Sequence, residues 1–177
     1  SLDMLTRVGI TDTEKRFNQY AFELSGGMRQ RAMIAMALST MPKLLLADEP
    51  TTALDVTIQA QVLKLMKDII KEYKMGVIFI THDLAVIAQT ADQIAVMYLG
   101  CIVEKGPVNE ILKNPKHPYT RGLIAALPDV NNLDAPLKPI PGNIPSPLER
   151  PSNCVFRSRC PNPTHECKEG KTPMGLI

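Results

Sequence analysis

The chain has 177 residues and a net charge of +2, with 45% hydrophobic and 21% charged residues. This balance favours a folded globular protein and excludes an acidic tail or the basic excess typical of nucleic-acid-binding proteins. No apolar run approaches the ~18 residues that span a bilayer, and the N-terminal residues lack a signal-peptide pattern. We therefore expect the four cysteines to be thiols or metal ligands in a reducing compartment, rather than disulfides.

The sequence has two parts of different character. Residues 1 to about 127 alternate helical patterns with short apolar runs, which predicts an α/β fold. Prolines are frequent over residues 128–153, and such a segment is compatible neither with a helix nor with a central strand. Three of the four cysteines follow in a short tail with few apolar residues.

A serine and two glycines open the first long helical pattern. Ser25, Gly26 and Gly27 precede a stretch that is apolar nearly all round after Arg31, which predicts a buried helix. Free N–H groups at a helix N-terminus, approached closely through glycines, suit a phosphate group. Ser25 as an ordinary N-cap, with glycines that permit a bend, is the commoner alternative for such a turn taken alone.

Two apolar runs and the helical pattern between them predict a βαβ unit. Leu44–Asp48 is apolar on both faces and is expected to be a buried, central parallel strand, with a second buried strand at Gly76–Ile80. Asp55 is placed to cap a helix over 56–73, whose apolar positions are Val62, Leu65, Met66, Ile69, Ile70 and Tyr73. A strand, an amphipathic helix and a strand in this order form a right-handed crossover.

A short helix and a hairpin follow this unit. Residues 83–91 have the pattern of a short helix. Residues 93–106 have the pattern of two strands that turn at Gly100. Because the connection is tight, we expect the two strands to pair antiparallel.

Acidic and polar residues end both predicted parallel strands. Asp48 and Glu49 end one strand, and Thr81 and His82 follow the other. The carboxyl ends of parallel strands share one edge of the sheet, where ligands bind in open α/β folds. The pattern suits metal-assisted phosphoryl transfer, with one carboxylate for Mg²⁺ and a second that orients or deprotonates water. The alternative is that Asp48 caps a turn and His82 is a loop residue without a catalytic role.

Four motifs in this order carry a resemblance to a known family. LSGGMRQR (24–31) resembles the signature motif of ATP-binding-cassette (ABC) ATPases, and LLLADEP (44–50) resembles their Walker B strand with its catalytic glutamate. TALD (52–55) resembles the D-loop, and THD (81–83) resembles the switch-histidine loop. Met28 departs from the commonest signature, which has Gln, and the form GGMRQR is similar to that of peptide-importer ATPases.

The C-terminal part narrows the resemblance. HPYTRGLIAALP (117–128) and the segment 141–167 resemble the region after the cassette in ATPases of dipeptide and oligopeptide importers, whose relatives transport nickel or sugar oligomers. The resemblance implies a helical-subdomain remnant at 1–40, the second half of the P-loop core at 41–115 and an importer-specific extension at 116–177. No GxxxxGK[ST] loop (Walker A) occurs in these residues. We therefore expect the C-terminal half of such an ATPase, unable to hydrolyse ATP by itself.

The resemblance also implies a role for each site residue. The Ser25–Gly27 turn would cap an ATP held by a second ABC ATPase subunit in a head-to-tail dimer, and Asp55 would contact that subunit. Asp48 would bind Mg²⁺ through water, Glu49 would be the general base, and His82 would sense the γ-phosphate. The intact subunit would hydrolyse ATP beneath an integral membrane permease, peripherally at the cytoplasmic face of the cell membrane, without binding nucleic acid.

The cysteine tail has the spacing C-x5-C-x6-C, at Cys154, Cys160 and Cys167. In the resembled importers such a tail supplies three ligands of a [4Fe–4S] cluster, and the fourth cysteine of their pattern is missing from these residues. We therefore expect little or no iron in this chain. A zinc site that uses His165, or no metal at all, are the alternatives. Cys101 is expected to be a packed residue of the hairpin turn.

Two other classes of function remain open. An ABC ATPase that acts on DNA or the ribosome would share the signature and Walker B motifs, but the HPYT segment, the cysteine tail and the lack of a basic stripe disfavour it. A non-catalytic binding or redox module could use the tail alone, but the presence of Asp48, Glu49 and His82 together disfavours it.

Overall fold

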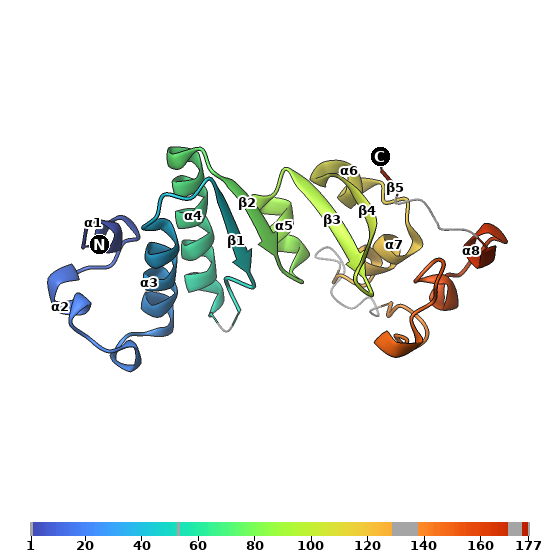
Figure 1. The fold of residues 1–177 in the computed structure, drawn as a ribbon, viewed down its shortest axis with the longest axis horizontal. Helices are drawn as coiled ribbons and strands as arrows, with labels where there is room; N and C mark the ends of the chain where they lie inside the picture. Colours follow the sequence, from blue (N-terminus) through green and yellow to red (C-terminus); the bar gives the residue numbers. More distant parts are fainter. Residues whose placement is uncertain (1, 53, 129–137, 170–174, 177) are drawn as a thin grey trace. The chain divides into compact units, whose positions relative to one another are not determined.

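The structure, a computed structural model, describes residues 2–52, 54–128, 138–169 and 175–176 (Figure 1). It forms two compact units, Ser1–Thr90 and Ala91–Ile177. Helices and strands alternate in the first unit, so the predicted α/β class is confirmed. Ala53 of the TALD motif and residues 129–137 of the proline-rich segment lie outside the described residues.

The first unit contains two strands and the helices around them. Its elements are α1 (Leu2–Arg7), α2 (Thr13–Phe17), the 3-10 helix η1 (Ala21–Glu23), α3 (Gly26–Leu38), β1 (Leu44–Asp48), α4 (Val56–Tyr73), β2 (Gly76–Ile80) and α5 (Leu84–Thr90). None of the described helices has the length and apolar character that a bilayer crossing requires.

The predicted strands and the helix between them are confirmed. β1 pairs with β2 in parallel, with Leu44 opposite Gly76 and Asp48 opposite Ile80, so the two strands end level with each other. The Asp55 side chain caps α4 as expected and accepts a hydrogen bond of 2.9 Å from the Ile58 amide. In Figure 1 α3 and α4 lie beside each other, and α4 lies next to this strand pair.

The core of the first unit is formed by apolar residues of α1, α3, β1 and α4. α4 buries the apolar residues Val62, Leu63, Met66 and Ile69. Of these, Val62, Met66 and Ile69 meet residues of α1 and α3 in one cluster. The prediction that the helix α3 is buried on all sides is wrong, because the side chains of Met33 and Met36 are 54% and 66% exposed. Of the described strands only β2 pairs with β1, which is therefore not central here. The predicted burial of both strands is also wrong, because Leu46 on β1 and Ile78 on β2 are 65% and 50% exposed. The burial of a segment depends on which elements pack around it, and the hydrophobic pattern of the segment does not identify those elements.

The second unit is built on an antiparallel hairpin, as predicted. β3 (Gln93–Tyr98) and β4 (Cys101–Pro107) turn at Leu99 and Gly100, both with positive φ. The remaining elements are α6 (Val108–Lys113), α7 (Pro118–Ala125), the 3-10 helices η2 (Pro147–Glu149) and η3 (Arg157–Arg159), α8 (Glu166–Glu169), and β5 (Gly175–Leu176), which pairs with β4 in parallel.

A buried carboxylate and an aromatic cluster organise the second unit. Glu104 on β4 is only 1% exposed, and its two oxygens accept hydrogen bonds from the backbone amides of Lys116 and His117, at 2.6 and 3.1 Å. Phe156 is also buried, and its ring contacts those of Tyr98, Tyr119 and His117. The HPYT segment therefore ties α7 to the hairpin, and Phe156 attaches the cysteine-containing tail to the same cluster.

Candidate functional site

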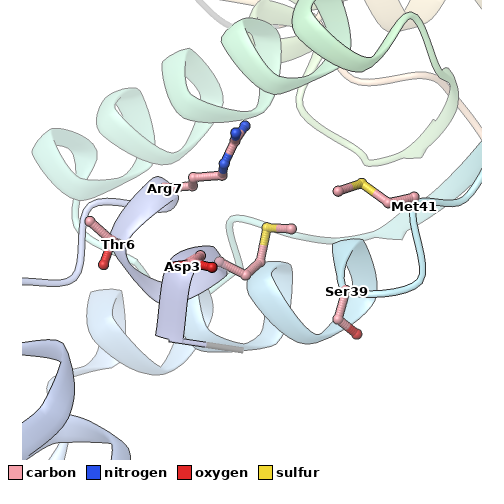
Figure 2. Close-up of a pocket in the computed structure, with 6 residues that line it drawn as sticks. Asp3, Thr6, Arg7, Ser39 and Met41 are labelled. Carbon is pink, nitrogen blue, oxygen red and sulfur yellow. The ribbon is translucent and has the colours of Figure 1, made fainter.

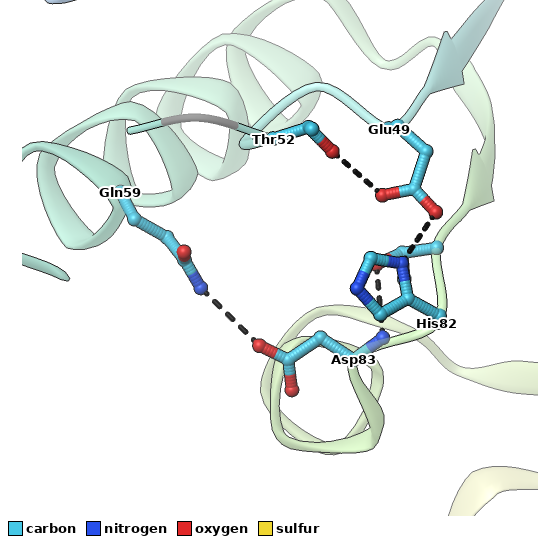
Figure 3. A network of polar contacts seen from close by, with 6 residues as sticks. Glu49, Thr52, Gln59, His82 and Asp83 are labelled. Atoms are coloured by element: carbon cyan, nitrogen blue, oxygen red, sulfur yellow. Dashed lines mark hydrogen bonds and ion pairs between the residues drawn. The ribbon is translucent and has the colours of Figure 1, made fainter. Parts of the chain in front are cut away.

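The ends of the two parallel strands carry a network of polar side chains. Glu49 follows β1 directly, in a left-handed backbone conformation (φ 45°), and its amide donates a hydrogen bond of 2.9 Å to the Ile80 carbonyl. His82 lies two residues beyond the end of β2. The level ends of the strands therefore bring the two loops together, as the sequence predicted (Figure 3).

Both oxygens of the Glu49 carboxylate have hydrogen-bond partners. His82 Nδ1 lies 2.8 Å from Oε1, and the Thr52 hydroxyl donates to Oε2 at 2.8 Å. In Figure 3 the carboxylate points toward both side chains. The bond with His82, and then that from Thr52, lower the pKa of Glu49 from its usual value. The bond with Glu49 in turn raises the pKa of His82.

This arrangement keeps Glu49 ionised and oriented. A carboxylate with a lowered pKa is deprotonated at neutral pH, and two donors on its oxygens fix the direction in which it can accept a further proton or water. The His82 side chain is 83% exposed, so its outer nitrogen is open to solvent or to a ligand. Chemically, the pair can hold a water molecule next to a carboxylate and present a hydrogen-bond donor to an anion.

A second set of bonds fixes the loop that carries His82. Asp83 Oδ1 accepts hydrogen bonds from the amides of Ala85 and Val86, at 2.8 and 3.3 Å, and so caps the start of α5. Asp83 Oδ2 accepts a bond of 3.3 Å from the side-chain amide of Gln59 on α4, which Figure 3 also shows. The switch-histidine loop is thus attached to two helices.

The glycine turn at the start of α3 is built against α4. The Ser25 hydroxyl accepts a hydrogen bond of 3.3 Å from the Met28 amide, so Ser25 is an N-cap. A Cβ atom on Gly27 would lie 2.8 Å from Cγ2 of Ile58, whereas one on Gly26 would come no closer than 3.9 Å to Leu54. Gly27 is therefore required for the close approach of α3 to α4, and the turn touches the same helix that contacts the His82 loop.

Comparisons with known proteins identify the family. The model of the family "ABC transporter" matches residues 2–52, and that of "Oligopeptide/dipeptide transporter, C-terminal region" matches residues 103–167. The chain belongs to the ABC transporter family, in its oligopeptide/dipeptide group. The matched ranges include the signature turn, the Walker B strand and the HPYT segment, which are among the residues that carry the resemblance in sequence.

Relatives of this ABC chain bear peptide-transport names. It is 45% identical over its whole length to the dipeptide transport ATP-binding protein DppD of Escherichia coli, and 48% identical over 96% of its length to DppD of Haemophilus influenzae. It is also 48% identical over its whole length to a peptide import ATP-binding protein of Brucella melitensis. The chain spans about half the length of these relatives, between 51% and 54%.

The cysteines of the oligopeptide/dipeptide region do not form a metal site in the described part of the chain. Cys154, Cys160 and Cys167 are half-buried free thiols, and no group of three or more His, Cys, Asp or Glu side chains there could hold a metal ion. The hydroxyl of Thr164 lies 3.3 Å from Cys167 Sγ and, with the Cys154 thiol, lowers the pKa of Cys167. Cys101 packs against the aromatic cluster, and its sulfur accepts a bond from Arg150.

A pocket of the first unit is separate from this network. It has a volume of about 620 Å³ and is lined by Asp3, Met4, Thr6, Arg7, Ser39 and Met41 (Figure 2). None of the motif residues lines it. Arg7 is held there by hydrogen bonds to Glu72 and, at 2.6 Å, to the Tyr73 hydroxyl.

Three polar residues in or near the motifs make contacts that the sequence did not predict. Thr52 belongs to the TALD motif, but nothing in its position indicated a bond to Glu49. Gln30 donates a hydrogen bond of 2.5 Å to the Pro50 carbonyl and so links α3 to the loop after β1. Gln59 is half-buried on a helix of apolar pattern. The sequence signal that could have indicated this contact is a polar residue, Gln59, four residues after the Asp55 cap of α4.

Proposed function

We propose that this chain is the part of a peptide-importer ATPase subunit that carries the catalytic carboxylate and the signature motif, and that the intact subunit couples ATP hydrolysis to peptide import. The observation that carries the proposal is the contact of Glu49 with His82 and Thr52 at the strand ends. It occurs in a chain 45% identical to a protein named for dipeptide transport. The peptide class rests on those names and on the match to the C-terminal region.

The site residues support a division of roles. Glu49 accepts a proton from the attacking water, because its carboxylate is ionised and oriented by two donors. His82 offers its outer nitrogen to the terminal phosphate. The Ser25–Gly27 turn and Asp55, which are both on the surface, face the ATP and the backbone of a second ABC ATPase subunit.

Mg²⁺ fits the residues present. Asp48 ends β1 with an exposed side chain beside Glu49, and a single carboxylate is the usual protein contribution when substrate phosphates and water complete the shell. Magnesium bound with ATP would neutralise charge on the phosphates during transfer. Asp48 would hold it through water.

The [4Fe–4S] cluster does not fit the described residues. The Cys167 thiol interacts with that of Cys154, but the described residues contain no group of three or more side chains that could hold a metal ion. No chemistry of the proposed function is assigned to iron.

The proposal includes the environment of the intact subunit. It forms a dimer of two ABC ATPase subunits beneath integral permease subunits, at the cytoplasmic face of the membrane. The three segments 1–40, 41–115 and 116–177 serve as helical subdomain, ATPase core and importer extension. Support comes from the signature turn, the strand-end network and the C-terminal region that lie within them.

A chimaera tests the function. The chain would replace the matching half of E. coli DppD, and dipeptide uptake and ATP hydrolysis would be measured in a strain without DppD. We expect the chimaera to restore uptake, and Glu49→Gln to reduce hydrolysis by about 10² to 10⁴-fold while ATP binding persists. Glu72→Gln makes the same charge change away from the site and should leave hydrolysis unchanged. Equal hydrolysis by the Glu49→Gln protein would contradict the proposal.

A further inference from the structure

The bond between Gln59 and Asp83 joins two helices that are far apart in sequence. Gln59 lies on the first turn of α4, which Asp55 caps, and its side-chain amide donates to Asp83 Oδ2 at 3.3 Å. Asp83 directly follows His82 in the chain. The bond therefore spans from the helix after the TALD motif to the switch-histidine loop, as Figure 3 shows.

The position of His82 depends on its neighbours in the chain. Its ring is largely exposed, and its described side-chain contact is the bond to Glu49. The residue before it, Thr81, accepts a hydrogen bond of 3.1 Å from the Asp83 amide, and Asp83 also caps α5. A side chain that is not held by packing takes its place from the backbone around it. Among the described residues, Gln59 is the side chain from outside this loop that forms a hydrogen bond with Asp83.

The same turn of α4 also meets the glycine turn. Ile58, the neighbour of Gln59, packs so close to Gly27 that a Cβ there would lie 2.8 Å from it, and its amide is bonded to Asp55. Three motifs thus meet consecutive residues of one helical turn. A displacement of this turn would be transmitted to the Glu49–His82 pair through Gln59.

We propose that Gln59 is a positioning residue that holds the His82 loop through Asp83, and that the first turn of α4 thereby couples the Gly27 turn to the Glu49–His82 pair. The positioning of the His82 loop by Gln59 concerns this chain alone, whereas the effect of Gln59 on ATP hydrolysis rests on the proposed function.

The chemistry of the bond defines the variants that test it. Gln59→Leu removes the donor at similar size, and Gln59→Glu places a carboxylate against that of Asp83. Gln59→Lys keeps a donor and should rescue the contact. Gln61→Leu is the matched control, because Gln61 lies on the same helix and accepts a bond of 3.1 Å from Arg31 instead.

The first measurement uses the chain itself, with NMR signals of the His82 ring and amide hydrogen exchange in the cap of α5. With Leu or Glu at position 59, the His82 signals should shift and the amides of Ala85 and Val86 should exchange about tenfold faster. The Lys variant and Gln61→Leu should match the unchanged chain. If the Gln59→Leu chain fails to fold, the comparison of Gln59→Glu with Gln59→Lys tests the proposal. Unchanged His82 signals in the folded Leu or Glu variant would overturn the proposal, as would an equal effect of Gln61→Leu.

A double-mutant cycle separates positioning from a general loss of stability. Asp83→Ser keeps one oxygen to cap α5 but removes the partner of Gln59. The effect of Gln59→Leu on the His82 signals should disappear in that background, because the two residues act through one bond. If Gln59→Leu shifts the His82 signals equally in the Asp83→Ser background, Gln59 does not act through its bond to Asp83.

The second measurement uses the DppD chimaera. Gln59→Leu should lower kcat by at least about tenfold with KM for ATP unchanged, since a misplacement of ~1 Å can reduce catalysis by ~10²-fold, and Gln59→Lys should restore it. If Glu49→Gln leaves hydrolysis intact, the proposed function fails and the NMR result still decides the positioning. If Glu49→Gln abolishes hydrolysis but Gln59→Leu leaves kcat unchanged, the coupling to catalysis is refuted.

Discussion

The contact between Gly27 and Ile58 makes the two glycines of the signature turn unequal. We expect Gly27→Ala to destabilise the chain and Gly26→Ala to be neutral or stabilising. A Cβ at Gly27 would lie 2.8 Å from Ile58 Cγ2, a separation that real structures avoid. At Gly26 the nearest atom would be 3.9 Å away, which is an ordinary contact. Ile58 cannot easily turn aside, because a β-branched side chain on a helix has one strongly preferred rotamer.

The magnitude follows from two opposing effects. Replacement of a helical glycine by alanine stabilises by up to about 1 kcal/mol, and both positions share this gain. Overpacking costs about 1–3 kcal/mol, and only Gly27 incurs it. The two variants should therefore differ by about 1–3 kcal/mol in the free energy of unfolding.

Chemical denaturation followed by circular dichroism measures this difference. Ile58→Ala removes the clashing atom, so Gly27→Ala should lose most of its penalty in that background, and the cycle should give a coupling of about 1–2 kcal/mol. Equal stabilities of the Gly26→Ala and Gly27→Ala chains would refute the reasoning. So would a penalty for Gly27→Ala that persists unchanged beside Ile58→Ala.

Three further predictions concern charge and packing. The pKa of His82, raised by Glu49, should exceed 6.5 in an NMR titration and fall in Glu49→Gln. The stabilisation by this pair is complete between pH 4.5 and the unfolded His82 pKa. It is lost as pH rises through the folded His82 pKa, which is raised, and as pH falls through the folded Glu49 pKa, which is lowered. An unaltered His82 titration in Glu49→Gln would contradict this. Glu104→Ala leaves two amides before α7 without their acceptor and should destabilise the second unit by about 2–4 kcal/mol in thermal unfolding, whereas a loss below about 1 kcal/mol would contradict this role of Glu104. Phe156→Ala should cost about 3–5 kcal/mol and make residues 138–169 sensitive to proteolysis; unchanged resistance would show that other contacts hold the tail.

Local pattern was sufficient for the elements of the first unit from α3 to α5, whereas α1, α2 and η1 were not predicted. The apolar runs predicted β1 and β2 to the residue, and Asp55 with the 3.6-residue period that follows predicted α4. These features depend on interactions within a few residues, namely a cap, a turn and the alternation of apolar and polar positions. Motif order was equally local, and it indicated the family before any contact was known.

Contacts across long stretches of chain were decided only by the tertiary structure. Glu49 and His82 were expected at the same edge, but their bond, and that of Thr52, depend on the level register of β1 and β2. The link from Gln59 to Asp83 crosses 24 positions and left no periodic signal. Periodicity reports which face of a segment is apolar, whereas side-chain partners depend on the distance and direction between elements, which no local sequence pattern encodes.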